Sequence, residues 1–158
     1  MARELITSWG DYQTAIDHLL FMACRKICIY DEDLGQLKLD SALRLPQILR
    51  VLQAGHKESL QVIIRNADLL RHRSPLLIKL FADFGHLASA HQSPPHLANL
   101  RDSMLIVDDK YALIRFERDL PRSKLLLDST DELKPYLNRF SELSSAGGEP
   151  ISTNTLGL

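Results

Sequence analysis

Three polar residues between Arg101 and Phe116 have the spacing of a catalytic motif. Ser103 follows Arg101 by two positions and Asp108 follows it by seven, with apolar residues at 104–107. A guanidinium stays protonated at physiological pH and only donates hydrogen bonds, so Arg101 suits holding a phosphate or carboxylate rather than attacking one. The residue types therefore predict anion binding and argue against nucleophilic catalysis.

The same spacing resembles the signature of the phospholipase D superfamily, in which His, any residue, Lys, four residues and Asp lie on a strand leading into a tight hairpin. Arg101 stands where that family has its nucleophilic His and Ser103 where it has Lys, while Leu105–Asp108 matches well. Arg101 cannot carry a phosphoryl group and Ser103 cannot neutralise charge on phosphoryl oxygens. The resemblance implies a phospholipase D-like half-domain with a degenerate motif, with no catalytic residues at these positions. The alternative is an ordinary hairpin.

Asp108 would orient the His in the family, and here there is no His to orient. We expect it instead to support a turn through hydrogen bonds to nearby backbone. Basic residues follow the strand expected at residues 60–65, namely Arg65, Arg71 and Arg73. Ligands of open α/β sheets collect beyond the carboxyl ends of strands, and guanidinium groups suit phosphate geometry. We therefore predict an anion pocket made of Arg65, Arg71, Arg73, Arg101 and Asp108. The alternative is a set of solvated residues around a helix start, with Arg101 paired to a local carboxylate.

Other polar residues leave an enzymatic alternative open. His91 or His96 could reach the site as a displaced nucleophile from the loop around residues 94–95. Asp31 and Asp33 follow an expected strand, but without a nearby His or third carboxylate we expect a solvated turn rather than a metal site. The sequence thus predicts neither a metal nor a cofactor.

Composition places the chain among ordinary globular domains. It has 158 residues, is 45% hydrophobic and carries a net charge of −1. No global field would draw it onto nucleic acid or anionic lipid, although nucleic acid is not excluded. There is no signal-like or membrane-spanning apolar run, so we expect a cytoplasmic protein without membrane contact. Cys24 and Cys28 lack the spacing of a metal or redox pair, and we expect both to be buried.

Periodicity predicts an α/β fold with a mixed β-sheet flanked by helices. The expected domain is 1–145, and 146–158 should be a disordered tail. Expected helices are 11–24, a segment within 41–54, one from Pro75 and one after Ser129 or Thr130, and expected strands are 25–30, 60–65, 88–91, 104–116 as a hairpin, and 124–128. Pro46 either opens or kinks the second helix.

Three functional classes remain open from the sequence. The leading prediction is a non-catalytic binding or interaction module of a bacterial-type protein, with a phosphate-containing ligand. The others are a phosphodiesterase with a displaced His and a pure protein-interaction or dimerisation domain. Active single-half members of the family pair two motifs across a symmetric dimer, so the resemblance also implies a homodimer.

Overall fold

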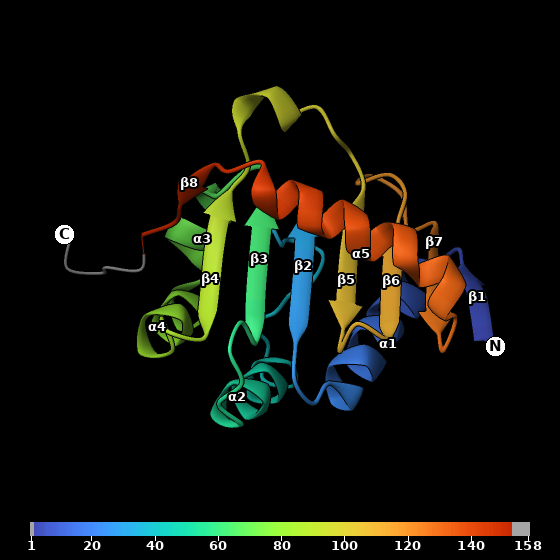
Figure 1. The fold of residues 1–158 in the computed structure, drawn as a ribbon, viewed down its shortest axis with the longest axis horizontal. Coiled ribbons are helices and arrows are strands. Elements are labelled where there is room, and N and C mark those ends of the chain that lie inside the picture. Colours follow the sequence, from blue (N-terminus) through green and yellow to red (C-terminus); the bar gives the residue numbers. More distant parts are fainter. Residues whose placement is uncertain (1, 153–158) are drawn as a thin grey trace.

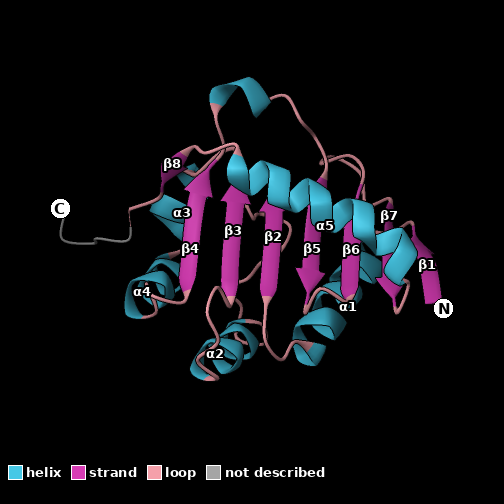
Figure 2. Cartoon of the chain, viewed as in Figure 1, coloured by secondary structure: helices cyan, strands magenta, loops and turns pink. Residues whose placement is uncertain are grey.

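The structure, a computed structural model, describes residues 2–152, and Figure 2 distinguishes its helices, strands and loops. The strands are β1 (Ala2–Ile6), β2 (Ile27–Asp31), β3 (Leu60–Ile64), β4 (Ala88–Gln92), β5 (Ser103–Val107), β6 (Tyr111–Arg115), β7 (Ser123–Leu127) and β8 (Glu149–Pro150). The helices are α1 (Trp9–Met22), α2 (Leu45–Gln53), α3 (Asp68–Arg73), α4 (Pro75–Asp83) and α5 (Thr130–Ser145), with a short 3-10 helix at Pro95–Leu97.

All strands of the described part join one open sheet in the order β1-β7-β6-β5-β2-β3-β4-β8. β2, β3 and β4 run parallel, and the remaining neighbours pair antiparallel. Figure 1 shows α5 across one face of the sheet and the other helices behind it. The mixed α/β sheet flanked by helices that the sequence predicted is confirmed.

Two hydrophobic cores explain why the central strands are apolar on both sides. One core packs the helices α1, α2, α3 and α4 against the back of the sheet, and the other core packs α5 against its front. All five residues of β2 are buried because helices cover both faces there. Apolar burial on two faces, rather than alternation, is therefore the pattern that fixes the position of β2 in the middle of the sheet.

Local signals set the helix starts. Ser8 caps α1 by accepting a hydrogen bond from the Asp11 amide at 3.1 Å, so the helix begins at Trp9, two residues earlier than predicted. Pro46 lies in the first turn of α2 and opens that helix rather than kinking it. Pro135, in contrast, lies inside α5.

β1 and α3 were not predicted from the sequence. β1 pairs antiparallel with β7 at the edge of the sheet, where Arg3, Glu4 and Leu5 stay exposed and give no buried-strand pattern. α3 is a six-residue helix, and only one of its residues is buried. Short elements with little apolar burial have weak periodicity, which explains both omissions.

Two other expectations differ from the structure. Residues 146–152 were expected in a disordered tail, yet β8 pairs with β4 and the Ile151 amide donates to Ala90 O at 2.9 Å. Burial of the Ile151 side chain against the back core holds this segment, while residues 153–158 lie outside the described residues. Cys28 is buried as expected, but Cys24 is exposed because it follows the end of α1.

Candidate functional site

Charged side chains gather where β2 and β3 end and β5 begins. Because β5 runs antiparallel to β2, its first residue, Ser103, lies beside the last residue of β2, Asp31. Arg115 ends β6 and pairs with Ser103 across the sheet. A hollow of about 360 Å³ opens at this edge. We call it the edge hollow, and it is lined by Asp31, Glu32, Asp33, Gly35, Gln36, Arg115, Arg118 and Asp119.

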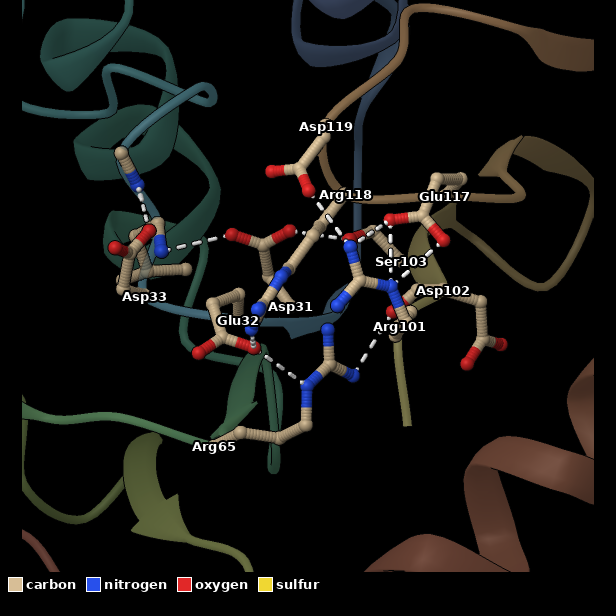
Figure 3. Close-up of polar contacts among 12 residues, drawn as sticks. Asp31, Glu32, Asp33, Arg65, Arg101, Asp102, Ser103, Glu117, Arg118 and Asp119 are labelled. Atoms are coloured by element: carbon tan, nitrogen blue, oxygen red, sulfur yellow. Dashed lines mark hydrogen bonds and ion pairs between the residues drawn. The ribbon is translucent and has the colours of Figure 1, made fainter. Parts of the chain in front are cut away.

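The floor of the edge hollow is a buried ion pair between Arg115 and Asp31, and Figure 3 shows the Asp31 carboxylate next to Ser103. The Arg115 guanidinium donates to Asp31 Oδ1 at 2.9 Å, and both side chains are almost fully buried. Ser103 Oγ donates to the same carboxylate oxygen, and the Leu34 amide donates to the other oxygen at 2.7 Å. The Ser103 hydroxyl is therefore buried and occupied by this network.

Aromatic rings enclose the Arg115 guanidinium on the α1 side. Its central carbon lies 5.2 Å from the ring centre of Tyr12 and 5.5 Å from that of Trp9. Such contacts with the ring faces favour a cation. Burial raises the pKa of Tyr12 to about 12, so its phenol stays neutral. Arg115 is thus held by the fold and presents little of itself to a ligand.

Arg65 lies on the side of the sheet edge opposite to Arg115. Its guanidinium is also bound by protein groups. Its Nε donates to Glu32 Oε1 at 3.0 Å, and one terminal nitrogen donates to the Asp102 carbonyl oxygen at 2.9 Å. Its guanidinium carbon lies 4.9 Å from the ring centre of Tyr30. Glu32 also pairs with Arg118 at 3.0 Å. Burial favours a higher pKa for Glu32, but the hydrogen bonds from the two arginines outweigh it and lower the pKa.

Arg101 is exposed and held by two carboxylates of the β6–β7 loop. Its Nε lies 2.7 Å from both oxygens of Glu117, and a terminal nitrogen lies 2.6 Å from Asp119. Hydrogen bonding from Arg101 lowers the pKa of Glu117. This is the local pairing that the alternative interpretation of the sequence expected. Exposed pairs of this kind contribute little stability, so the arginine can exchange partners.

The other residues predicted for the anion pocket, Arg71, Arg73 and Asp108, lie away from the edge hollow. Arg71 and Arg73 lie exposed in the last turn of α3, line no part of the edge hollow, and have no ion pair within residues 2–152. Asp108 lies at the other end of β5, so the expectation that it approaches Arg101 is wrong. The five-residue strand between them alone spans roughly 17 Å, at about 3.3 Å per residue.

Asp108 instead joins two distant segments of the chain. Its carboxylate accepts hydrogen bonds from the amides of Cys24, Arg25 and Lys26 at 2.8–2.9 Å. The expected bonds to nearby turn backbone are therefore replaced by bonds to the segment between α1 and β2. Its φ of 56° also places it in the left-handed region, which Asp tolerates. Asp108 is a structural clamp here.

The other candidate groups lie outside the edge hollow or serve its loops. His91 lies half-buried on β4 and His96 lies exposed in the 3-10 helix, and neither lines the edge hollow. Asp33 accepts a hydrogen bond from the Gly35 amide at 2.8 Å, as a turn residue does. Within residues 2–152 no three His, Cys, Asp or Glu side chains are grouped so as to hold a metal ion. No helix in that range is long and apolar enough to cross a membrane.

Sequence reasoning missed most of the residues that build the site. Arg115 could have been noticed as a charged residue at the end of an otherwise apolar strand, but its partner Asp31 is 84 positions away. The carboxylates of Glu32, Glu117 and Asp119 carry no local signal, because only the folded edge brings them to the arginines.

No protein-family model matches the sequence, and no curated protein sequence matches it. Solved structures do match. The archaeal chromatin protein TrmBL2, described as having a novel mode of DNA binding, superposes with a TM-score of 0.70 at 15% identity over 96% of this chain. This chain spans about half of that protein, 54% of its length.

Two further structures match over nearly their whole length. NucT from Helicobacter pylori has a TM-score of 0.62 at 12% identity, covering 94% of this chain and 98% of NucT. Nuc from Salmonella typhimurium, a phospholipase D family member, has a TM-score of 0.58 at 11% identity, covering 95% and 97%. Identities this low show the fold alone. The fold of this chain is therefore phospholipase D-like.

Proposed function

We propose that this chain is a non-catalytic phospholipase D-like binding module whose ligand enters the edge hollow. The proposal rests chiefly on Ser103, whose buried hydroxyl is bound to Asp31 at the position where the family motif has Lys. Arg101 adds support, because a guanidinium replaces the nucleophilic imidazole. A site with these groups can hold a ligand but lacks the nucleophile for cleavage by the family route.

The ligand that we propose carries a phosphate group, which Arg101 and Arg118 bind. Arg118 lines the edge hollow, and Arg101 reaches it through Asp119, which both lines the hollow and pairs with Arg101. Phosphate must replace Glu32, Glu117 and Asp119 as the partners of these arginines. Four carboxylates and two arginines line the hollow, so binding is expected to be weak and sensitive to salt.

Calorimetric titration with inorganic phosphate, adenosine monophosphate and a short oligonucleotide tests this site. The double variant Arg101→Ala/Arg118→Ala should lose binding, while the matched control Arg71→Ala/Arg73→Ala should bind like the parent. Loss of binding by the control variant alone would show that the binding site lies at α3. Absence of binding by the parent to all three probes would overturn the phosphate proposal.

DNA binding, which is described for TrmBL2, is the second candidate because that structure superposes over 96% of this chain. DNA binding has less support here, since the net charge is −1 and Arg65, Arg101 and Arg115 are paired with carboxylates. A DNA interface predicts tighter binding of the oligonucleotide than of the mononucleotide, with a steep salt dependence. Equal affinity for the oligonucleotide and the mononucleotide would indicate that the protein recognises the phosphate group alone.

The enzymatic alternative requires a displaced nucleophile, His91 or His96. Incubation with bis(p-nitrophenyl) phosphate measures it directly, and the proposal expects no release of nitrophenol above the buffer rate. Hydrolysis by the parent that disappears in His91→Ala or His96→Ala would replace the binding module by a phosphodiesterase.

A further inference from the structure

The layer formed by α1, α2 and α4 carries large apolar side chains toward solvent. Phe21 on α1 is 72% exposed, Leu43 just before α2 is 63% exposed, and Leu76 on α4 is 55% exposed. Figure 1 shows the three helices side by side behind the sheet, with α2 between α1 and α4. Exposed apolar groups gathered on one face mark an interaction surface. We call this surface the helical face.

An apolar groove of about 250 Å³ runs between α2 and α4 on the helical face. Only Lys79 and Asp83 give it charge, and they pair with each other at 2.9 Å on its rim. Its apolar lining consists of Leu45, Pro46, Leu49, Leu76, Leu80 and Phe84. The groove can therefore accept an aromatic ring without burying an unpaired polar group.

We propose that the helical face is the interface of a twofold homodimer in which Phe21 of each copy inserts into the α2–α4 groove of the other. α1 and α4 flank α2 on opposite sides, so a twofold axis that lies along α2 in the interface plane sets α1 of each copy against α4 of the other. Such an interface is isologous and closed, and each copy supplies one protruding ring and one groove.

Charges beside the ring and the groove fit this arrangement. Asp17 lies one helical turn before Phe21 on α1; its Oδ1 accepts a hydrogen bond from the buried Arg44 at 2.7 Å, and 36% of its side chain stays exposed. The partner's Lys79 lies on the rim of the groove that receives the ring, with its side chain 70% exposed. Its pair with Asp83 is exposed and weak, so Lys79 can turn to Asp17 across the interface.

A second copy of this chain is the occupant that explains both features at once. A twofold partner uses both, because the exposed Phe21 ring and the apolar groove lie on opposite sides of α2. The interface lies on the helices that cover the back of the sheet, whereas a dimer that pairs two family motifs would form around Arg101. It is also independent of the proposed ligand site.

Sedimentation velocity of the full chain over a range of concentrations tests the dimer. The parent should sediment as a dimer at micromolar concentration, and Phe21→Ala should weaken dimerisation at least about 30-fold, as expected for a central aromatic anchor. Phe116→Ala, which removes another exposed ring outside the helical face, should sediment like the parent. A monomeric parent, or a Phe21→Ala variant that dimerises like the parent, would overturn the proposal.

Disulfide trapping tests which surfaces touch. In a Cys24→Ala background, which removes the exposed native thiol, mixing Phe21→Cys with Leu76→Cys protein under mild oxidation should give a mixed disulfide dimer. Phe116→Cys mixed with Leu76→Cys should give none. A dimer that sediments normally but forms no cross-link between positions 21 and 76 would place the interface elsewhere and refute the insertion of Phe21.

Discussion

Replacing Arg115 with Met removes the cation from the floor of the edge hollow while keeping most of the side-chain volume. Asp31 would then stay buried with hydrogen bonds but no counter-charge, since its side chain is 1% exposed and that of Arg115 is 2% exposed. Breaking a buried ion pair by removing one partner costs about 3–5 kcal/mol. At about 2–4 °C per kcal/mol for a domain of this size, the melting temperature should fall by roughly 6–20 °C.

Urea denaturation followed by tryptophan fluorescence and far-ultraviolet circular dichroism measures this loss. Trp9 is the single tryptophan of the chain and lies 5.5 Å from the Arg115 guanidinium, so it reports on the floor directly. Arg71→Met, at an exposed arginine, should change stability by less than about 0.5 kcal/mol. The double variant Asp31→Asn/Arg115→Met keeps hydrogen-bonding groups without the charge, and should lose less than the sum of the two single variants. A loss below about 1 kcal/mol for Arg115→Met, or additive losses, would refute the buried-pair reasoning.

Three further outcomes follow from other contacts. Asp108→Ala should destabilise the fold by about 2–4 kcal/mol, because the amides of residues 24–26 lose a charged acceptor; a loss under about 0.5 kcal/mol in chemical denaturation would refute the clamp. Glu32 has a lowered pKa, so its contribution to stability is present above its unfolded pKa of about 4.5 and disappears as pH falls through the folded pKa. Acid titration of stability should therefore be shallower for Glu32→Gln below about pH 4.5, and identical slopes would contradict the two ion pairs. In thiol labelling of the folded chain, Cys24 should react quickly, whereas Cys28, whose burial raises its pKa to about 12, should react only on unfolding; two fast thiols would contradict its burial.

The fold was accessible from the sequence because its central elements carry strong apolar patterns. The strand at Leu60–Ile64 and the hairpin around Asp108 lie where periodicity and turn residues predicted them. β1 escaped prediction because it lies at the sheet edge with little burial. The segment around Ile151 also escaped, since its polar composition resembles that of a disordered tail and only its pairing with β4 reveals its place.

The site was only partly accessible. The spacing of Arg101, Ser103 and Asp108 predicted a strand and hairpin, but the positions of the charges depend on how the strands run. Because β5 is antiparallel to β2, Arg101 meets the carboxyl ends of the parallel strands while Asp108 meets their amino ends. Pairing across 84 residues, as between Asp31 and Arg115, leaves no local trace in a single sequence.

Phosphorus magnetic resonance of a phosphate diester mixed with the purified chain tests the central claim most directly, because one spectrum reports both binding and cleavage. The account predicts that the parent protein shifts or broadens the diester signal and that the Arg101→Ala/Arg118→Ala variant leaves this signal as in the free diester. No monoester signal should appear after prolonged incubation. A growing monoester signal that depends on the protein, or a diester signal that the protein leaves unchanged, would contradict it.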